Sequence, residues 1–168
     1  VDTPETVAWL KGFAAHVQGN GRRPMVVGEV WTHTEVVSDY VQQGALELGF
    51  EFDLAEAILD AANSGTKDKL AYALGNVTAS YPPNQFAAFL TNHDQDRVAN
   101  VLDQDPAKLK LAAARLLAGP GVPFLYYGEE IGQVGAKPDE MIRNPMPWSG
   151  AANGGFTTAA RPWERLQR

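Results

Sequence analysis

The stretch FLTNHDQDR, residues 89–97, decides how the rest of this sequence is interpreted. Its apolar start runs directly into Asn92-His93-Asp94 and three more polar residues, so four ionisable side chains gather where the apolar pattern stops. A short apolar run that ends in such groups is typical of a buried strand whose C-terminal end carries functional side chains. The stretch therefore predicts a strand over residues 86–92 with a polar site at its end.

The composition excludes several classes of partner and site. The 168 residues are 45% apolar and 20% charged, which predicts a globular domain with a core. A net charge of −6 without a run of Lys or Arg gives no electrostatic basis for binding nucleic acid or an anionic membrane. The absence of Cys excludes disulfides, thiolate zinc sites and a Cys nucleophile. No apolar run approaches the roughly 20 residues of a membrane span, and residues 1–13 do not resemble a signal peptide. The cellular compartment stays open.

Helical and strand patterns alternate along the chain. Strands are predicted at residues 25–31, 48–54, 86–92 and 122–128, and helices at residues 4–19, 34–43, 55–77 with a break at 63–65, and 106–118. Because right-handed crossovers join successive strands, all four should be parallel, with their C-terminal ends on one rim. The predicted fold class is therefore α/β, with a (βα) domain over residues 1–150 and a tail over residues 151–168.

Ionisable residues follow three of the predicted strands. Glu29, Asn92-His93-Asp94 and Glu129-Glu130 each lie at or just past a C-terminal strand end, the rim on which α/β barrels build active sites. Any one of these groups is more simply explained as a helix cap or a turn former. Their coincidence on one rim favours a site.

The residue types indicate sugar chemistry. Glu29 is flanked by apolar residues, as suits a general acid, and Asp94 would be a second carboxylate in a different environment, which is typical of glycosidic sites. His93 would donate a hydrogen bond to a substrate hydroxyl. Trp31 would either stack on a sugar ring or belong to the core. A metal-dependent hydrolase that uses Glu29, His33, His93 and Asp94 is a weaker alternative, because no tight His pair is present.

Three segments resemble, in order, the strand-five, strand-seven and strand-eight motifs of the α-amylase family of retaining glycoside hydrolases and transglycosidases. They are MVVGEVW at residues 25–31, FLTNHD at residues 89–94 and GVPFLYYGEE at residues 121–130. LGFEFDL falls where strand six of the family would be, and residues 137–148 look like the loop after strand eight in oligosaccharide-processing members. The resemblance implies a half-barrel, strands five to eight of a (βα)8 or TIM barrel.

The resemblance also implies roles for individual residues. Glu29 would be the acid/base, and Asp94 would bind sugar hydroxyls and stabilise the oxocarbenium-like transition state. His93, Asn92 and Trp31 would contact the substrate, an α-1,4-glucan or maltooligosaccharide. No cofactor is expected, and the calcium sites of the family depend partly on a domain outside these residues. Arg97 would brace the site or serve the fold.

The strand-four nucleophile is missing from the pattern. The family carries this Asp in a glycine-aromatic-arginine-x-aspartate motif that does not occur in this sequence. Asp2 has a compatible separation from Glu29, but Thr3-Pro4-Glu5 reads as a helix start, which favours a capping role. We therefore expect a chain that is inactive alone. The alternative is a non-catalytic half-barrel that binds carbohydrate.

A half-barrel leaves two sheet edges and one apolar face uncovered. We expect self-association, with a homodimer closing an eight-stranded barrel as one solution.

Overall fold

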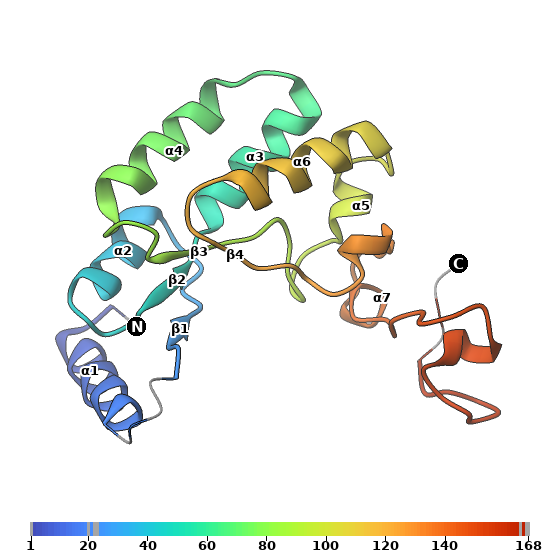
Figure 1. Cartoon of the computed structure of the whole chain (residues 1–168), viewed down its shortest axis with the longest axis horizontal. Coiled ribbons are helices and arrows are strands. Elements are labelled where there is room, and N and C mark those ends of the chain that lie inside the picture. Colours follow the sequence, from blue (N-terminus) through green and yellow to red (C-terminus); the bar gives the residue numbers. More distant parts are fainter. Residues whose placement is uncertain (1, 20, 22–23, 165, 167–168) are drawn as a thin grey trace.

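The computed structural model describes residues 2–19, 21, 24–164 and 166, and its centre is a four-stranded parallel sheet (Figure 1). The strands are β1 (Val27–Gly28), β2 (Leu48–Phe50), β3 (Phe86–Ala88) and β4 (Val122–Pro123), which lie side by side in chain order. Every neighbouring pair is parallel. The predicted α/β architecture is therefore confirmed, and the C-terminal strand ends share one rim.

Helices connect the strands and form an arc along one side of the sheet in Figure 1. The longer ones are α1 (Pro4–Gln18), α2 (Thr34–Gln42), α3 (Phe52–Ser64), α4 (Asp68–Ser80) and α6 (Pro106–Ala118), and the short ones are α5 (Val98–Val101) and α7 (Asp139–Ile142). Two 3-10 turns, η1 (Glu129–Ile131) and η2 (Ala152–Gly155), follow β4. Within the described part of the chain, no helix is long and apolar enough to cross a membrane.

Local sequence signals fix several helix ends. The Thr3 hydroxyl accepts the Thr6 N–H at 3.3 Å at the start of α1, and the Asp105 carboxylate accepts the Ala107 N–H at 2.8 Å at the start of α6. Each cap precedes a proline, whose fixed φ suits the first helical turn. Gly65 adopts a φ of 72° and ends α3 at the predicted break.

The two faces of the sheet bury different clusters. Residues 86, 88 and 90 pack with the helices in the main core, whereas Phe89 points to the opposite face, as the alternation of a strand requires. There Phe89 meets the rings of Phe50 and Phe52 edge-on, at centroid distances of 5.4 and 5.0 Å, and Phe124 packs on Phe50 at 4.9 Å. In a closed barrel, this aromatic face would line the interior.

The strands are shorter than the sequence predicted. Residues 51–54 were expected to extend the second strand, but α3 begins at Phe52. Leu54 and Ile58 pack in the main core, whereas Phe52 and Ala55 pack in the aromatic cluster. This helix start is therefore buried on two sides, and its apolar residues suit a strand period as well as a helical one. The fourth strand was expected to be buried, yet Val122 and Pro123 are exposed, because β4 is an edge of the described sheet.

The last part of the chain has little regular structure. After residue 150, η2 is the only regular element among the residues that the structure describes. The domain boundary at residue 150 stays a prediction.

Candidate active site at the strand ends

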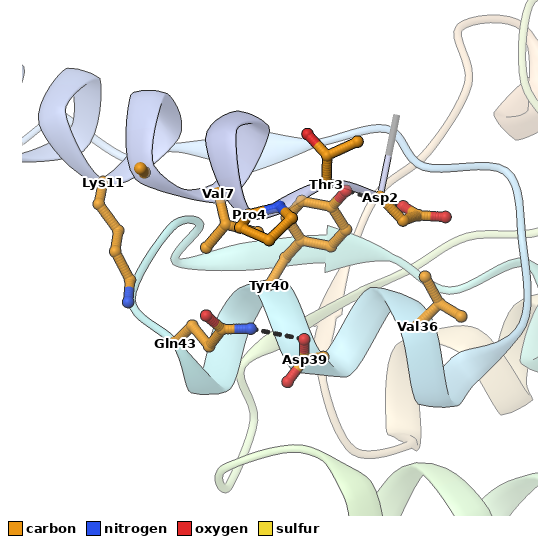
Figure 2. Close-up of a pocket in the computed structure, with 10 residues that line it drawn as sticks. Asp2, Thr3, Pro4, Val7, Lys11, Val36, Asp39, Tyr40 and Gln43 are labelled. Carbon is orange, nitrogen blue, oxygen red and sulfur yellow. Dashed lines mark hydrogen bonds between the residues drawn. The ribbon is translucent and has the colours of Figure 1, made fainter.

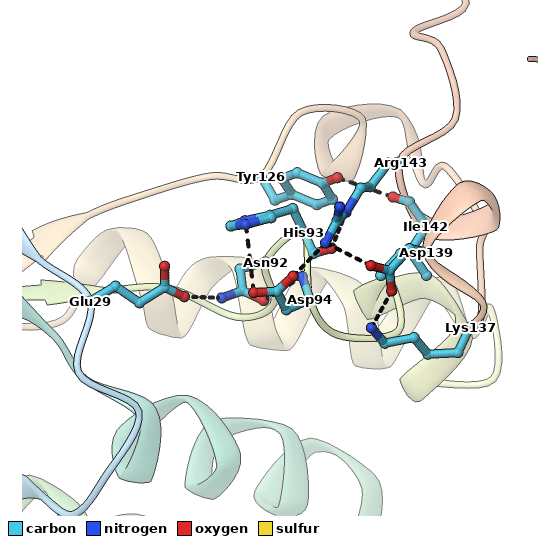
Figure 3. A network of polar contacts seen from close by, with 9 residues as sticks. All are labelled: Glu29, Asn92, His93, Asp94, Tyr126, Lys137, Asp139, Ile142 and Arg143. Atoms are coloured by element: carbon cyan, nitrogen blue, oxygen red, sulfur yellow. Dashed lines mark hydrogen bonds and ion pairs between the residues drawn. The ribbon is translucent and has the colours of Figure 1, made fainter. Parts of the chain in front are cut away.

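The structure brings Glu29 and the Asn92-His93-Asp94 segment together on the rim. Glu29 follows β1 directly, and the Asn92 side-chain amide donates to Glu29 Oε1 at 3.0 Å (Figure 3). Asn92 Oδ1 accepts the Asp94 backbone N–H at 3.0 Å, which sets the orientation of the amide. One asparagine therefore connects the two carboxylate-bearing segments.

Asp94 lies between two cationic or potentially cationic side chains. Its Oδ1 is 2.5 Å from Arg143 Nη2, and its Oδ2 is 3.5 Å from His93 Nε2. The same arginine donates from Nε to the His93 carbonyl at 2.8 Å. The sequence analysis did not identify Arg143 as a site residue, although Arg143 lies in residues 137–148, the loop that resembles the family. Its contact with Asp94 spans 49 residues and leaves no local pattern.

A second carboxylate shares Arg143. Asp139 Oδ2 lies 2.9 Å from Arg143 Nη2, one helical turn earlier in the chain, and Asp139 Oδ1 accepts a hydrogen bond from the Lys137 ammonium. The Lys137 hydrogen bond and the nearby Arg143 charge hold the pKa of Asp139 below its usual value. The loop after β4 thus adds two cations and one anion beside Asp94.

Trp31 is exposed and does not follow the strand pattern. The predicted strand over residues 25–31 includes Trp31, but β1 ends at Gly28. Trp31 instead stacks on Phe52, with centroids 4.8 Å apart and ring planes 14° apart, and is 59% exposed. It lines a hollow of about 580 Å³ that also includes His33 and Gln95, the neighbour of Asp94. Trp31 is therefore not a core residue, and its open face is available to a flat ligand.

The zinc alternative has no ligand cluster to support it. His33 pairs with Asp53 at 3.6 Å and His93 pairs with Asp94 at 3.5 Å, so the two imidazoles face different carboxylates. In the described residues, no group of three or more His, Cys, Asp or Glu could hold a metal ion.

The third group of strand-end acids is built into the scaffold. Glu129 accepts a hydrogen bond from the Thr91 hydroxyl at 3.0 Å, and burial raises the pKa of Glu129 to about 7. Glu130 accepts the Gly128 N–H at 2.8 Å within its own turn. These two carboxylates therefore support the loop after β4.

Arg97 is fully buried, and its guanidinium packs against two tyrosines whose rings meet edge-on. Its guanidinium carbon is 4.6 Å from the ring centroids of both Tyr126 and Tyr127, and Nη1 donates to the Tyr127 carbonyl at 2.6 Å. The Arg97 N–H also binds the Gly135 carbonyl at 2.8 Å. Arg97 thus connects the segment after β3 to the segment after β4.

Asp2 lies in the helical layer. Its Oδ1 accepts the Tyr40 hydroxyl at 2.7 Å, in a pocket of about 380 Å³ between α1 and α2 (Figure 2). Burial and the Asp2 carboxylate raise the pKa of Tyr40 to about 12. None of the residues that line this pocket belongs to the rim around Glu29 and Asp94. Capping of α1 is carried out by Thr3.

The geometry supports proton transfer and charge stabilisation. Glu29 is exposed on the rim, where a substrate oxygen can reach it, and its carboxylate is oriented by Asn92. Asp94 is oriented from both sides by Arg143 and His93. Such a pair can donate a proton on one side and stabilise positive charge on the other.

The comparisons with known proteins agree on one family. A family model described as "Alpha amylase, catalytic domain" matches residues 1–168. Alpha-amylase 3 of Dictyoglomus thermophilum is 34% identical over 152 residues, which cover 88% of this chain and 30% of that protein. Alpha-amylase SusG of Bacteroides thetaiotaomicron is 36% identical over 140 residues, which cover 79% of this chain and 20% of that protein.

Solved structures show the same relationship. The α-amylase from H. orenii superposes with a TM-score of 0.76 at 36% identity, over 83% of this chain and 30% of its own. A cyclic α-maltosyl-(1→6)-maltose hydrolase from Arthrobacter globiformis gives 0.76 at 26% identity, over 88% and 34%. This chain therefore spans between a fifth and a third of the length of these relatives.

Proposed function

Because this chain belongs to the α-amylase catalytic-domain family, we propose that it supplies one half of a retaining glycosidase site for α-1,4-glucans or maltooligosaccharides. That half contains Glu29 as acid/base and Asp94 as the carboxylate that stabilises the transition state. The observation that carries the proposal is the single amide of Asn92, which orients the Glu29 carboxylate and accepts the Asp94 N–H.

The proposed chemistry assigns one task to each side chain. Glu29 protonates the oxygen of the leaving sugar and later takes a proton from the incoming acceptor. Asp94 accepts hydrogen bonds from ring hydroxyls and faces the positive charge that develops at the anomeric carbon. His93, which is half exposed, donates to a hydroxyl of the same ring. The open face of Trp31 packs against a neighbouring sugar.

The names of the relatives support the proposed substrate class. Their names include α-amylases, a 4-α-glucanotransferase of Thermotoga neapolitana and a cyclomaltodextrinase of a Bacillus species. These names share α-linked glucose chains and differ between hydrolysis and transfer. We therefore propose an α-glucan ligand and leave the acceptor, water or a sugar, to experiment.

We propose that the nucleophile for the covalent step lies outside the site formed by Glu29 and Asp94. Retaining enzymes place two carboxyl groups about 5 to 5.5 Å apart across the scissile bond. Asp2, the candidate from the sequence, is held by Tyr40 in the helical layer. We propose that the 168 residues alone bind sugar without cleaving it efficiently, so that the second candidate is a non-catalytic carbohydrate-binding half-barrel.

Calorimetry with maltotetraose tests the binding part of this proposal. We expect binding by the native chain and clear weakening in His93→Ala and Asp94→Asn. Glu5→Gln, an exposed carboxylate on α1 outside the hollow that Trp31 lines, is the matched control and should bind as the native chain does. Absence of binding by the native chain, or equal weakening in all three variants, would contradict the proposed site.

We further propose that two copies associate. The strands β1 and β4 are the edges of the described sheet, and Phe50 and Phe124 are only partly buried on its aromatic face. Unpaired strand edges and an apolar face favour association with a second sheet. A homodimer would cover both.

A further inference from the structure

We propose that Arg143 is a positioning residue for Asp94, and that Tyr126 and Tyr127, which pack against the buried Arg97, hold Arg143 in place. The inference rests on the function proposed for Asp94 and adds to it the device that fixes its carboxylate.

Arg143 binds both the main chain and a side chain of the His93-Asp94 segment. Its Nη2 is 2.5 Å from Asp94 Oδ1, and its Nε donates to the carbonyl of His93 at 2.8 Å. Because the guanidinium is planar and rigid, these two bonds fix the carboxylate relative to its own backbone. Asp94 Oδ2 is not bound by the arginine and remains the oxygen for a sugar hydroxyl, beside His93.

The ion pair between Arg143 and Asp94 orients the carboxylate and contributes little to the stability of the fold. The Arg143 and Asp94 side chains are 43% and 36% exposed, and exposed ion pairs contribute little to folding. Arg143 also shares its Nη2 with Asp139 at 2.9 Å. The shared positive charge leaves Asp94 with part of its negative charge available to a substrate.

The backbone on both sides of Arg143 is anchored. The Tyr126 hydroxyl donates to the Ile142 carbonyl at 3.1 Å, and the Tyr127 hydroxyl donates to the Asn144 carbonyl at 2.6 Å (Figure 3 shows the first). Ile142 and Asn144 are both fully buried. Arg143 is thus the exposed residue between two fixed neighbours, and its side chain extends from a rigid base.

The anchoring tyrosines are themselves fixed by the segment that carries Asp94. Arg97, three residues after Asp94, is completely buried and packs against both tyrosine rings. Arg97 therefore reaches from the β3 loop into the β4 loop, while Arg143 reaches back from the β4 loop to the β3 loop. Two arginines that connect the loops in opposite directions hold the Asp94 carboxylate at a defined place.

Arg143→Lys and Arg143→Ala test the inference, with Arg161→Ala as the control from the exposed C-terminal segment. A lysine keeps the charge but cannot hold the His93 carbonyl and the Asp94 carboxylate together. We expect both Arg143 variants to bind maltotetraose about tenfold more weakly, the loss of one charge-assisted hydrogen bond, with thermal midpoints close to that of the native chain. The control should leave both quantities unchanged.

Backbone amide NMR gives a readout that does not depend on sugar. In both Arg143 variants, the signals of residues 93 and 94 should shift, and Tyr127→Phe, which removes the hydroxyl that holds the Asn144 carbonyl, should shift them in the same direction by less. If the native chain binds no sugar, the proposed function fails, and these shifts alone decide the positioning role.

Two results would overturn the inference. Full recovery of affinity and of the native shifts in Arg143→Lys would show that charge alone suffices. Unchanged signals of residues 93 and 94 in Arg143→Ala would show that the arginine does not position this segment.

Discussion

The side-chain amide of Asn92 donates to Glu29 Oε1 at 3.0 Å, across 63 residues of sequence. Because Asn92 Oδ1 is occupied by the Asp94 N–H, the amide cannot flip without losing both bonds. The acid proposed for leaving-group protonation is therefore oriented from the strand end that also presents Asp94. Asn92 thus binds the Glu29 carboxylate and the Asp94 backbone at the same time.

Asn92→Asp should weaken maltotetraose binding by about tenfold, because a carboxylate replaces the donor that faces Glu29 and repels it. Calorimetry measures the effect. Asn76→Asp is a matched control, since Asn76 donates to Glu35 at 2.9 Å in the helical layer. Equal affinities of the two variants would argue against a role for Asn92 at the site.

Gly28→Ala should destabilise the fold by about 1 to 3 kcal/mol, as overpacking of a core does. A Cβ on Gly28 would meet the Leu46 side chain, which is buried in the main core, and the strain would displace the adjacent Glu29. Urea unfolding provides the measurement. Gly75→Ala in α4, where a Cβ meets nothing within 4 Å, should instead stabilise the chain by roughly 0.5 to 1 kcal/mol. Two changes of the same sign would contradict this explanation.

Glu129 should make stability fall as the pH rises from about 4.5 to about 7. The pKa of Glu129 is raised from 4.5 to about 7 in the folded chain, so in this window the folded state keeps a proton that the unfolded state releases. Glu129→Gln should remove this loss, and its advantage over the native chain should grow by on the order of 3 kcal/mol across the window. Parallel curves of unfolding free energy against pH would exclude the effect.

Light scattering should give a mass above the 18.2 kDa of a single chain. The two open strand edges and the aromatic face around Phe89 provide the reason. A monomer that unfolds cooperatively would mean that these surfaces are satisfied within one copy, and the proposed homodimer would have to be abandoned.

The sequence predicted the features that depend on neighbouring residues. Thr3 and Asp105 begin helices because each caps a turn that starts with proline, and Gly65 ends one because it tolerates a positive φ. The placement of Glu29 and Asp94 on one rim followed from parallel strand order, which needs only the alternation of strands and helices.

The features that the sequence missed depend on distant contacts. The sequence around Phe52 is compatible with either a strand or a helix. The choice depends on the packing of Phe52 against Phe89 and Trp31 in the folded chain. Arg143 has no local signal because its partner lies 49 residues away. The exposure of Val122 reflects the absence of a further neighbour beside β4 in the described sheet.

Hydrolysis of an activated aryl α-maltoside by the chain alone tests the central claim most directly. If the chain carries the proposed acid/base and stabiliser without a nucleophile, turnover should be very slow or absent, even though the leaving group barely needs the acid. Added azide should attack the anomeric carbon from the opposite face and release the β-maltosyl azide, and Asp94→Asn should abolish this rescue. Turnover without azide that is lost in Asp2→Ala would contradict the account and make Asp2 the nucleophile.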